Sequence, residues 1–219
     1  MNMADKHDGQ ETSDGYGDTE PSPMFMSLQE MREFMQNQLP PSPKPKEIEH
    51  VVLDADDTIW EVEPWGIASL AHPIGHTEED VLPAALNLDY VREPLEYWRD
   101  TVPTGHVRLA PKLRETLGKL KQKGIPVSIA SINNKRMVLK YLDAFGLRDE
   151  FTDIEANLGS GKDEMVRNIA KRNNVDSAKI LFVDDNPHNA IDVSTRTKAT
   201  SLVLGYNIQT IEDILGFIK

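Results

Sequence analysis

The segment VVLDADDTIW, residues 51–60, places three aspartates directly after an apolar run. The run at 51–53 is typical of a buried β-strand. The carboxylates of Asp54, Asp56 and Asp57 repel one another and resist removal from water. A strand that ends in such a cluster therefore needs compensating positive charge close by.

Apolar segments and amphipathic segments alternate through much of the remaining chain. We predict strands at 49–54, 126–130, 180–184 and 200–204, and a shorter one near 151–155. We predict helices at 111–123, 134–145, 161–173, 187–195 and 209–218. Strands that alternate with helices form a parallel sheet with helices on both faces, so the predicted fold class is α/β. Ligands bind to such sheets at the carboxyl ends of the strands.

Residues 61–108 interrupt this alternation and are long for a connection. We interpret them as a small cap-like insertion after the first strand, lying over the carboxyl edge of the sheet, with a helix near 88–99. His72 and His76 are four residues apart in this segment, but Pro73 and Gly75 lie between them. Helical metal-ligand spacing is therefore not expected there.

The first 46 residues differ in composition from the rest. Residues 1–23 contain six acidic residues and one lysine, with few aliphatic residues, which predicts disorder. Residues 24–39, MFMSLQEMREFMQNQL, predict a Met-rich helix that packs on the domain, or that binds a protein partner or a second copy of the chain. A Pro-rich linker follows at 40–46. We therefore predict a tail, helix and linker at 1–46 and a folded domain at 47–219.

The overall composition argues against several classes of function. A net charge of −12 over 219 residues disfavours binding to a nucleic acid scaffold, because phosphate contacts need Lys and Arg. The absence of cysteine excludes disulfides, thiolate metal sites and a cysteine nucleophile. No apolar run approaches the ~18 residues of a membrane span, and the amino terminus lacks a signal-peptide pattern. We therefore expect a cytoplasmic protein that does not bind a membrane.

Polar residues stand at the ends of several predicted elements: Asp54, Asp56, Ser131, Asp184 and Asp185 at strand ends, and Lys162 at a helix start. Because parallel strands share one carboxyl edge, we expect these side chains to converge on one pocket. A divalent cation between Asp54 and Asp184, with Lys162 beside it, would compensate the acids. Hard oxygen ligands suit Mg²⁺.

The spacing of Asp54 and Asp56 would point both side chains to the same face of an extended segment. One carboxylate could then attack an electrophilic phosphorus while the other moves protons. The candidate groups for holding phosphoryl oxygens are Ser131, Ile132, Asn133 and Lys162. Asn133 and Asn134 are also candidates for capping the helix that follows.

The run Asp54–Thr58 resembles the DxDx[TV] signature of the haloacid dehalogenase-like (HAD) superfamily of phosphohydrolases. Ser131, Lys162 and the pair Asp184 and Asp185 resemble its second, third and fourth motifs, in the order of the family, over roughly residues 49–205. The segments DADDTIW and FVDDNPHN are most similar to the magnesium-dependent phosphatase branch, subfamily IIIC, whose members have little or no cap.

This resemblance implies a Rossmann-like, HAD-like core, Mg²⁺ and an aspartyl-phosphate intermediate. It implies metal ligation by Asp54, by the backbone carbonyl of Asp56 and by Asp184, with Asp185 acting through water. Trp60 and Trp65 follow the acidic run. Both are expected to pack at the base of the insertion, or one of them lines the leaving-group pocket and stacks on the substrate.

The sequence thus predicts a Mg²⁺-dependent phosphatase with Asp54 and Asp56 as catalytic residues. The substrate would be a phosphorylated small molecule or a phosphoprotein, selected by residues 61–108. Two alternatives stay open. One is a phosphoryl- or acyl-group transferase of the same fold, and the other is a non-catalytic binding module that acts through the helix at 24–39.

Overall fold

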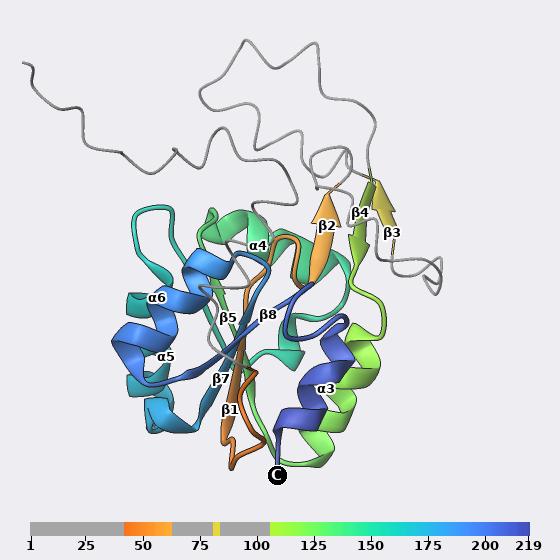
Figure 1. Ribbon diagram of the computed structural model, residues 1–219. Coiled ribbons are helices and arrows are strands. Elements are labelled where there is room, and N and C mark those ends of the chain that lie inside the picture. Colours follow the sequence, from red (N-terminus) through yellow and green to blue (C-terminus); the bar gives the residue numbers. More distant parts are fainter. Residues whose placement is uncertain (1–41, 63–80, 84–105) are drawn as a thin grey trace, which may run out of the picture. The chain divides into compact units, whose positions relative to one another are not determined.

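Five parallel strands form the central sheet of the computed structural model, which describes residues 42–62, 81–83 and 106–219 (Figure 1). The strands lie in the order β6-β5-β1-β7-β8. Their bounds are β1 His50–Leu53, β5 Val127–Ser131, β6 Asp153–Ala156, β7 Ile180–Asp184 and β8 Thr200–Val203. Each neighbouring pair is parallel. This confirms the predicted α/β class and the five predicted strands.

Strand β1 lies between β5 and β7 at the centre of the sheet. Leu53, its last residue, is level with Ile129 of β5 and with Val183 of β7. The segments that follow these three strands therefore leave the sheet side by side at its carboxyl edge, where open α/β sheets bind ligands.

Four helices confirm the predictions made for the connections between strands: α3 Leu113–Gln122, α4 Lys135–Ala144, α5 Lys162–Asn173 and α6 Pro187–Thr197. Side chains at the strand-to-helix junctions fix where two of these helices begin. The Asn134 side chain accepts a hydrogen bond from the Arg136 N–H, and the Asn186 side chain accepts one from the His188 N–H. Both asparagines are thus N-caps, which satisfy otherwise unpaired backbone donors of the first turn.

The remaining helical segments are short 3₁₀ helices: η5 Arg148–Glu150, η6 Ser177–Lys179 and η7 Ile211–Phe217. The helix predicted at 209–218 is therefore η7, which is not an α-helix. In a 3₁₀ helix, side chains three residues apart lie directly above one another. This brings Ile211 and Ile214 to the same side, where both are buried.

The sheet is buried between two apolar clusters, one on each face. Alternate residues of β1 separate them: Val51 and Leu53 belong to the cluster that contains residues of α3, α4 and η7, and Val52 belongs to the cluster with α5 and α6. Figure 1 shows α5 and α6 together on the side of the sheet opposite α3. A sheet buried on both faces explains the continuous apolar runs of its strands.

A second, three-stranded antiparallel sheet, in the order β2-β4-β3, follows the central β1 strand in the chain. Its strands are β2 Trp60–Val62, β3 Val81–Pro83 and β4 His106–Leu109. The pairing of β2 with β4 joins the two ends of the predicted insertion at 61–108. These strands were not predicted, because three or four residues are too few to show an alternating pattern.

Several predictions lie outside the described residues. They concern the acidic tail at 1–23, the Met-rich helix at 24–39, the helix near 88–99, and Trp65. Within the described ranges, none of the helices combines the length and the apolar character that a membrane span requires.

Candidate active site

The loop at 54–60 is a tight turn that begins where β1 ends. The Ala55 carbonyl accepts hydrogen bonds from the N–H groups of Ile59, at 2.9 Å, and Trp60, at 3.2 Å. Asp57 has a left-handed φ of 56°, and its N–H donates to the Trp60 carbonyl at 2.7 Å. The strand ends at Leu53, so Asp54 and Asp56 do not lie on the extended segment from which a shared face was predicted.

Lys162, the first residue of α5, joins two of the predicted site residues. Its ammonium group forms ion pairs with Asp54 Oδ1 and with Asp184 Oδ2, the latter at 2.9 Å, and donates to the Ala130 carbonyl at 2.8 Å. The Lys162 side chain is buried. An ammonium group has three donors, so these contacts use all of them and fix the charge between the two carboxylates.

Asp54, Asp184 and Asp185 each offer a carboxylate oxygen, and these atoms lie within 4.8 Å of one another. We refer to these three acids with Lys162 as the carboxyl-edge cluster. A set of oxygen ligands alone suits a hard cation such as Mg²⁺. Asn189 supports one of these ligands, because its Nδ2 donates to Asp184 Oδ1 at 3.1 Å and to Oδ2 at 3.2 Å.

The electrostatics of the cluster favour a bound cation. Burial raises the pKa of Asp54 well above its usual value, although Lys162 acts in the opposite direction. Burial, with the charges of Asp184 and Asp57, raises the pKa of Asp185 to about 7. Burial lowers the pKa of Lys162, but the two carboxylates beside it raise it by more. One ammonium therefore does not balance the acids, and a divalent cation would stabilise their charged forms.

Asp56 makes a separate set of contacts. Its Oδ1 accepts a hydrogen bond from Trp60 Nε1 at 2.9 Å, and its Oδ2 accepts one from Asn133 Nδ2 at 2.7 Å. Trp60 is fully buried, with its ring edge-on to Tyr141 at 5.4 Å between centroids. Stacking of Trp60 on a substrate is therefore excluded, because no face of its ring is exposed.

The predicted phosphoryl-binding residues at the end of β5 are placed differently from one another. The Ser131 hydroxyl is buried and has no hydrogen-bond partner among the described residues. Ile132 is 44% exposed. The Asn133 side chain contacts Asp56, as described above, and its Oδ1 accepts from the Asn134 N–H at 2.6 Å. A buried hydroxyl without a partner is available for a bound ligand.

Sequence reasoning missed two contacts at this edge. One is the bond from Trp60 to Asp56, and the other is the support of Asp184 by Asn189. A signal for the second exists: Asn186 and Pro187 mark a helix start, so Asn189 must lie in the first turn, beside the end of β7. The bond from Trp60 to Asp56 has no comparable signal in the sequence, because it forms across the turn at 54–60.

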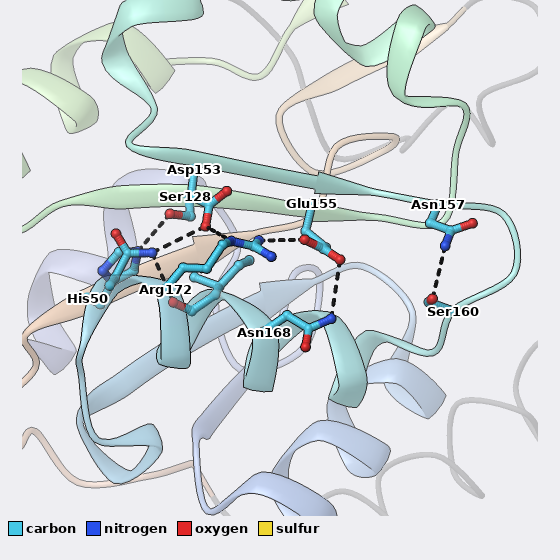
Figure 2. A network of polar contacts seen from close by, with 10 residues as sticks. His50, Ser128, Asp153, Glu155, Asn157, Ser160, Asn168 and Arg172 are labelled. Carbon is cyan, nitrogen blue, oxygen red and sulfur yellow. Dashed lines mark hydrogen bonds and ion pairs between the residues drawn. The ribbon is translucent and has the colours of Figure 1, made fainter.

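A second polar network lies on the face of the sheet that packs against α5 (Figure 2). His50 Nε2 and Ser128 Oγ are hydrogen-bonded at 2.8 Å. Arg172 forms ion pairs with Asp153 Oδ2 at 2.7 Å and with Glu155 Oε2 at 2.5 Å. Asn168 donates to Glu155, and Asn173 donates to Asp153. We call these seven residues the amino-end network, because it begins at the first residues of β1 and β6.

A family comparison identifies the class of protein to which this site belongs. Residues 76–191 match the family model described as haloacid dehalogenase-like hydrolase, and the chain therefore belongs to that family. The matched region includes Ser131, Lys162, Asp184 and Asp185, whereas Asp54 and Asp56 lie before it. No curated protein matches the chain.

Solved structures share the fold at low sequence identity. A HAD-superfamily hydrolase of subfamily IA from Geobacter sulfurreducens is 13% identical with a TM-score of 0.54, covering 78% of this chain and 100% of its own. The N-terminal part of the protein BF1531 from Bacteroides fragilis, containing a phosphatase domain complexed with Mg, is 18% identical with a TM-score of 0.51. That match covers 78% of this chain but only 40% of the other.

A predicted phosphoglycolate phosphatase from Haemophilus somnus is 15% identical, with a TM-score of 0.50 over 78% of this chain and 97% of its own. These structures support the expected HAD-like core. The assignment to subfamily IIIC stays a prediction.

Proposed function

We propose that this protein is a Mg²⁺-dependent phosphatase that hydrolyses phosphomonoesters through an aspartyl-phosphate intermediate. The observation that carries the proposal is the convergence of Asp54, Lys162 and Asp184 in a chain of the haloacid dehalogenase-like hydrolase family. The Bacteroides structure contains a phosphatase domain complexed with Mg, and the Haemophilus structure is a predicted phosphoglycolate phosphatase, so both support the same reaction class.

The residues present fit a Mg²⁺ ion. Asp54, Asp184 and Asp185 supply oxygen ligands alone, close enough together to share one ion, and the backbone carbonyl of Asp56 is a further candidate. When bound, Mg²⁺ would offset the negative charge of the phosphoryl group and help to orient it.

Asp54 acts as the nucleophile. One of its carboxylate oxygens forms a bond to phosphorus while the bond from phosphorus to the ester oxygen breaks. Asp56 donates its proton to that ester oxygen, so the leaving group departs as an alcohol. In the second step, water attacks phosphorus and Asp56 takes the proton from the water. The bond from phosphorus to Asp54 breaks, which releases phosphate and restores both aspartates.

Lys162 and Ser131 hold the phosphoryl group during both steps. The Lys162 ammonium lies against the nucleophile, so a phosphoryl oxygen that comes close to Asp54 can replace one of its three present acceptors. The Ser131 hydroxyl, unpartnered among the described residues, can donate to another. The backbone N–H groups of Ile132 and Asn133 are further candidates. The substrate would be a phosphorylated small molecule or a phosphoprotein side chain.

The test is release of phosphate from p-nitrophenyl phosphate by the wild type and by Asp54→Asn, with Mg²⁺ and with EDTA. We expect turnover that needs both Mg²⁺ and Asp54. Asp143→Asn is the matched control, because Asp143 is an exposed acid that pairs with Arg148 on the surface. Equal turnover by Asp54→Asn and the wild type, or full activity in EDTA, would contradict the proposal.

A further inference from the structure

The Asp56 carboxylate is held from two sides by donors that come from different parts of the fold. Trp60, at the start of β2, donates to Oδ1, and Asn133, between β5 and α4, donates to Oδ2. A carboxylate rotates easily about its terminal torsion when it is unrestrained. One donor on each oxygen removes this rotation, and each oxygen keeps a lone pair that can carry the transferred proton.

The Trp60 donor is itself fixed. Its indole ring is buried and packs edge-on against Tyr141, with an angle of 66° between the two rings. Its backbone pairs with Leu109 of β4, and its N–H and carbonyl both bond within the 54–60 loop. An indole N–H can only donate, and leaving it unpaired in the interior is costly. The bond to Asp56 is therefore the stable arrangement of this side chain.

The Asn133 donor has a defined orientation as well. Its Oδ1 accepts from the Asn134 N–H, so its Nδ2 must face the other way, toward Asp56. Neither asparagine nor tryptophan changes its charge during a reaction cycle. Both donors can therefore stay in place while Asp56 gives up a proton and takes one back.

We propose that Trp60 and Asn133 are positioning residues that hold Asp56 at the angle required for proton transfer to the leaving group. This inference rests on the proposed function. Proton transfer requires the two heavy atoms to approach within about 3 Å, so a freely rotating carboxylate would lose much of its effect. The benefit depends on the ester: a nitrophenolate leaves with little help, whereas an alkoxide needs the proton as the bond breaks.

The test is turnover on three esters whose leaving groups are increasingly basic: p-nitrophenyl, phenyl and benzyl phosphate. The variants are Trp60→Phe, which keeps an aromatic ring beside Tyr141 but removes the N–H, and Asn133→Leu, which keeps the approximate shape. Asp56→Asn removes the proton donor itself and so gives the largest expected dependence of turnover on the leaving group. We expect each single variant to lose little on p-nitrophenyl phosphate and about tenfold or more on benzyl phosphate, in the same direction as Asp56→Asn.

Asn134→Ala is the matched control. Asn134 is the neighbour of Asn133, but its side chain caps α4 by accepting a hydrogen bond from the Arg136 N–H. We expect this variant to melt at a lower temperature and to show the wild-type dependence on the leaving group. Because Asn133 lies in a half-buried loop, its variant remains informative if Trp60→Phe does not fold.

The outcomes separate this inference from the proposed function. If Asp56→Asn shows the dependence on the leaving group and both single variants lose activity equally on all three esters, or not at all, the positioning role is wrong and the phosphatase proposal stands. If the wild type hydrolyses none of the esters, or Asp54→Asn hydrolyses them as well as the wild type does, both are wrong.

Discussion

The two ends of the central sheet both contain clusters of polar side chains, but these side chains differ in burial and in how they are paired. In the amino-end network, each of the two acids of β6, Asp153 and Glu155, forms an ion pair with the guanidinium group of Arg172, which is partly exposed. In the carboxyl-edge cluster, three buried or half-buried acids lie around one ammonium group, and the hydroxyl of Ser131, at the end of the neighbouring strand β5, has no partner among the described residues. A single strand of four residues, β1, connects the two ends.

The difference separates stability from function. Polar groups that all have partners favour one arrangement of the fold. Buried acids in excess of their cations destabilise the folded state unless a ligand completes them. We infer that the excess of acids at the carboxyl edge binds a cation, which in turn binds a phosphoryl group. We infer that the amino-end network stabilises the fold. Variants at the two ends should therefore change different measured quantities.

The largest effect is expected for Lys162→Met. Turnover should fall about 10²- to 10³-fold, because the variant loses the group that stabilises negative charge beside Asp54. The variant leaves Asp54 and Asp184 without a cation, so added Mg²⁺ should raise its melting temperature more than that of the wild type. Lys171→Met, on the exposed side of the same helix, is the control. A variant with near-normal turnover would place the phosphoryl group elsewhere.

His50 should make stability depend on pH. Burial, partly offset by Asp153, lowers the pKa of His50 from 6.5 to about 4. Between these values the unfolded chain binds a proton that the folded chain does not, so stability is full above pH 7 and is lost as the pH falls. The loss is about 3 kcal/mol over the whole interval. Urea unfolding at pH 7.5 and pH 5, which covers about 1.5 pH units of this interval, should show a loss of about 2 kcal/mol.

In that comparison, His50→Gln should lose much less stability between the two pH values than the wild type does. His188→Gln, at an exposed position, is the matched control and should behave as the wild type. If His50→Gln and the wild type lose the same amount, the imidazole is not the group that titrates. Turnover at pH 7.5 should be unchanged in both variants, since neither histidine lies in the carboxyl-edge cluster.

Asn189→Ala should weaken the response to Mg²⁺. Asn189 donates to both oxygens of Asp184, and loss of such a supporting residue lowers metal affinity about 10- to 100-fold. The concentration of Mg²⁺ that gives half-maximal phosphate release should rise accordingly. Asn168→Ala is the control from the amino-end network, because Asn168 donates to Glu155. An equal shift in both variants would show a general loss of stability.

The smallest effect is expected for Arg172→Met. Its ion pairs with Asp153 and Glu155 are partly exposed, so their loss should cost about 1 kcal/mol in the free energy of unfolding. Turnover at saturating substrate and Mg²⁺ should not change. Arg148→Met removes a single, more exposed ion pair with Asp143 and should cost less. A large fall in turnover of Arg172→Met would mean that the two ends of the sheet are coupled.

Much of the central fold could be predicted from the sequence, because each strand of the sheet is a short apolar run and most helices have a regular apolar face. The order of the strands brings Asp54, Lys162 and Asp184 to one edge of the sheet. This convergence could be predicted, because the carboxyl ends of parallel strands all lie at the same edge. The β2-β4-β3 sheet could not be predicted, since its pairing joins Trp60 to Leu109 across most of the insertion.

Side-chain partners were harder to predict than strand positions. The bond from Trp60 to Asp56 spans the turn in which Asp57 has a left-handed φ of 56°, and no local sequence pattern indicates that turn. The amino-end network depends on how α5 packs across β6, so Arg172 gave no signal as a partner of Asp153. The periodicity of the sequence predicts helices and strands, but it does not predict side-chain contacts between elements that pack together only in the folded protein.

Calorimetric titration of Mg²⁺ into the metal-free protein tests the central claim, that the carboxyl-edge cluster is completed by a cation. The wild type should bind one Mg²⁺ per chain, and Asp184→Asn should lose that binding, because Asp184 is both a proposed ligand and a partner of Lys162. Asp153→Asn, from the amino-end network, should bind Mg²⁺ as the wild type does. No binding to the wild type, or unchanged binding to Asp184→Asn, would contradict the account.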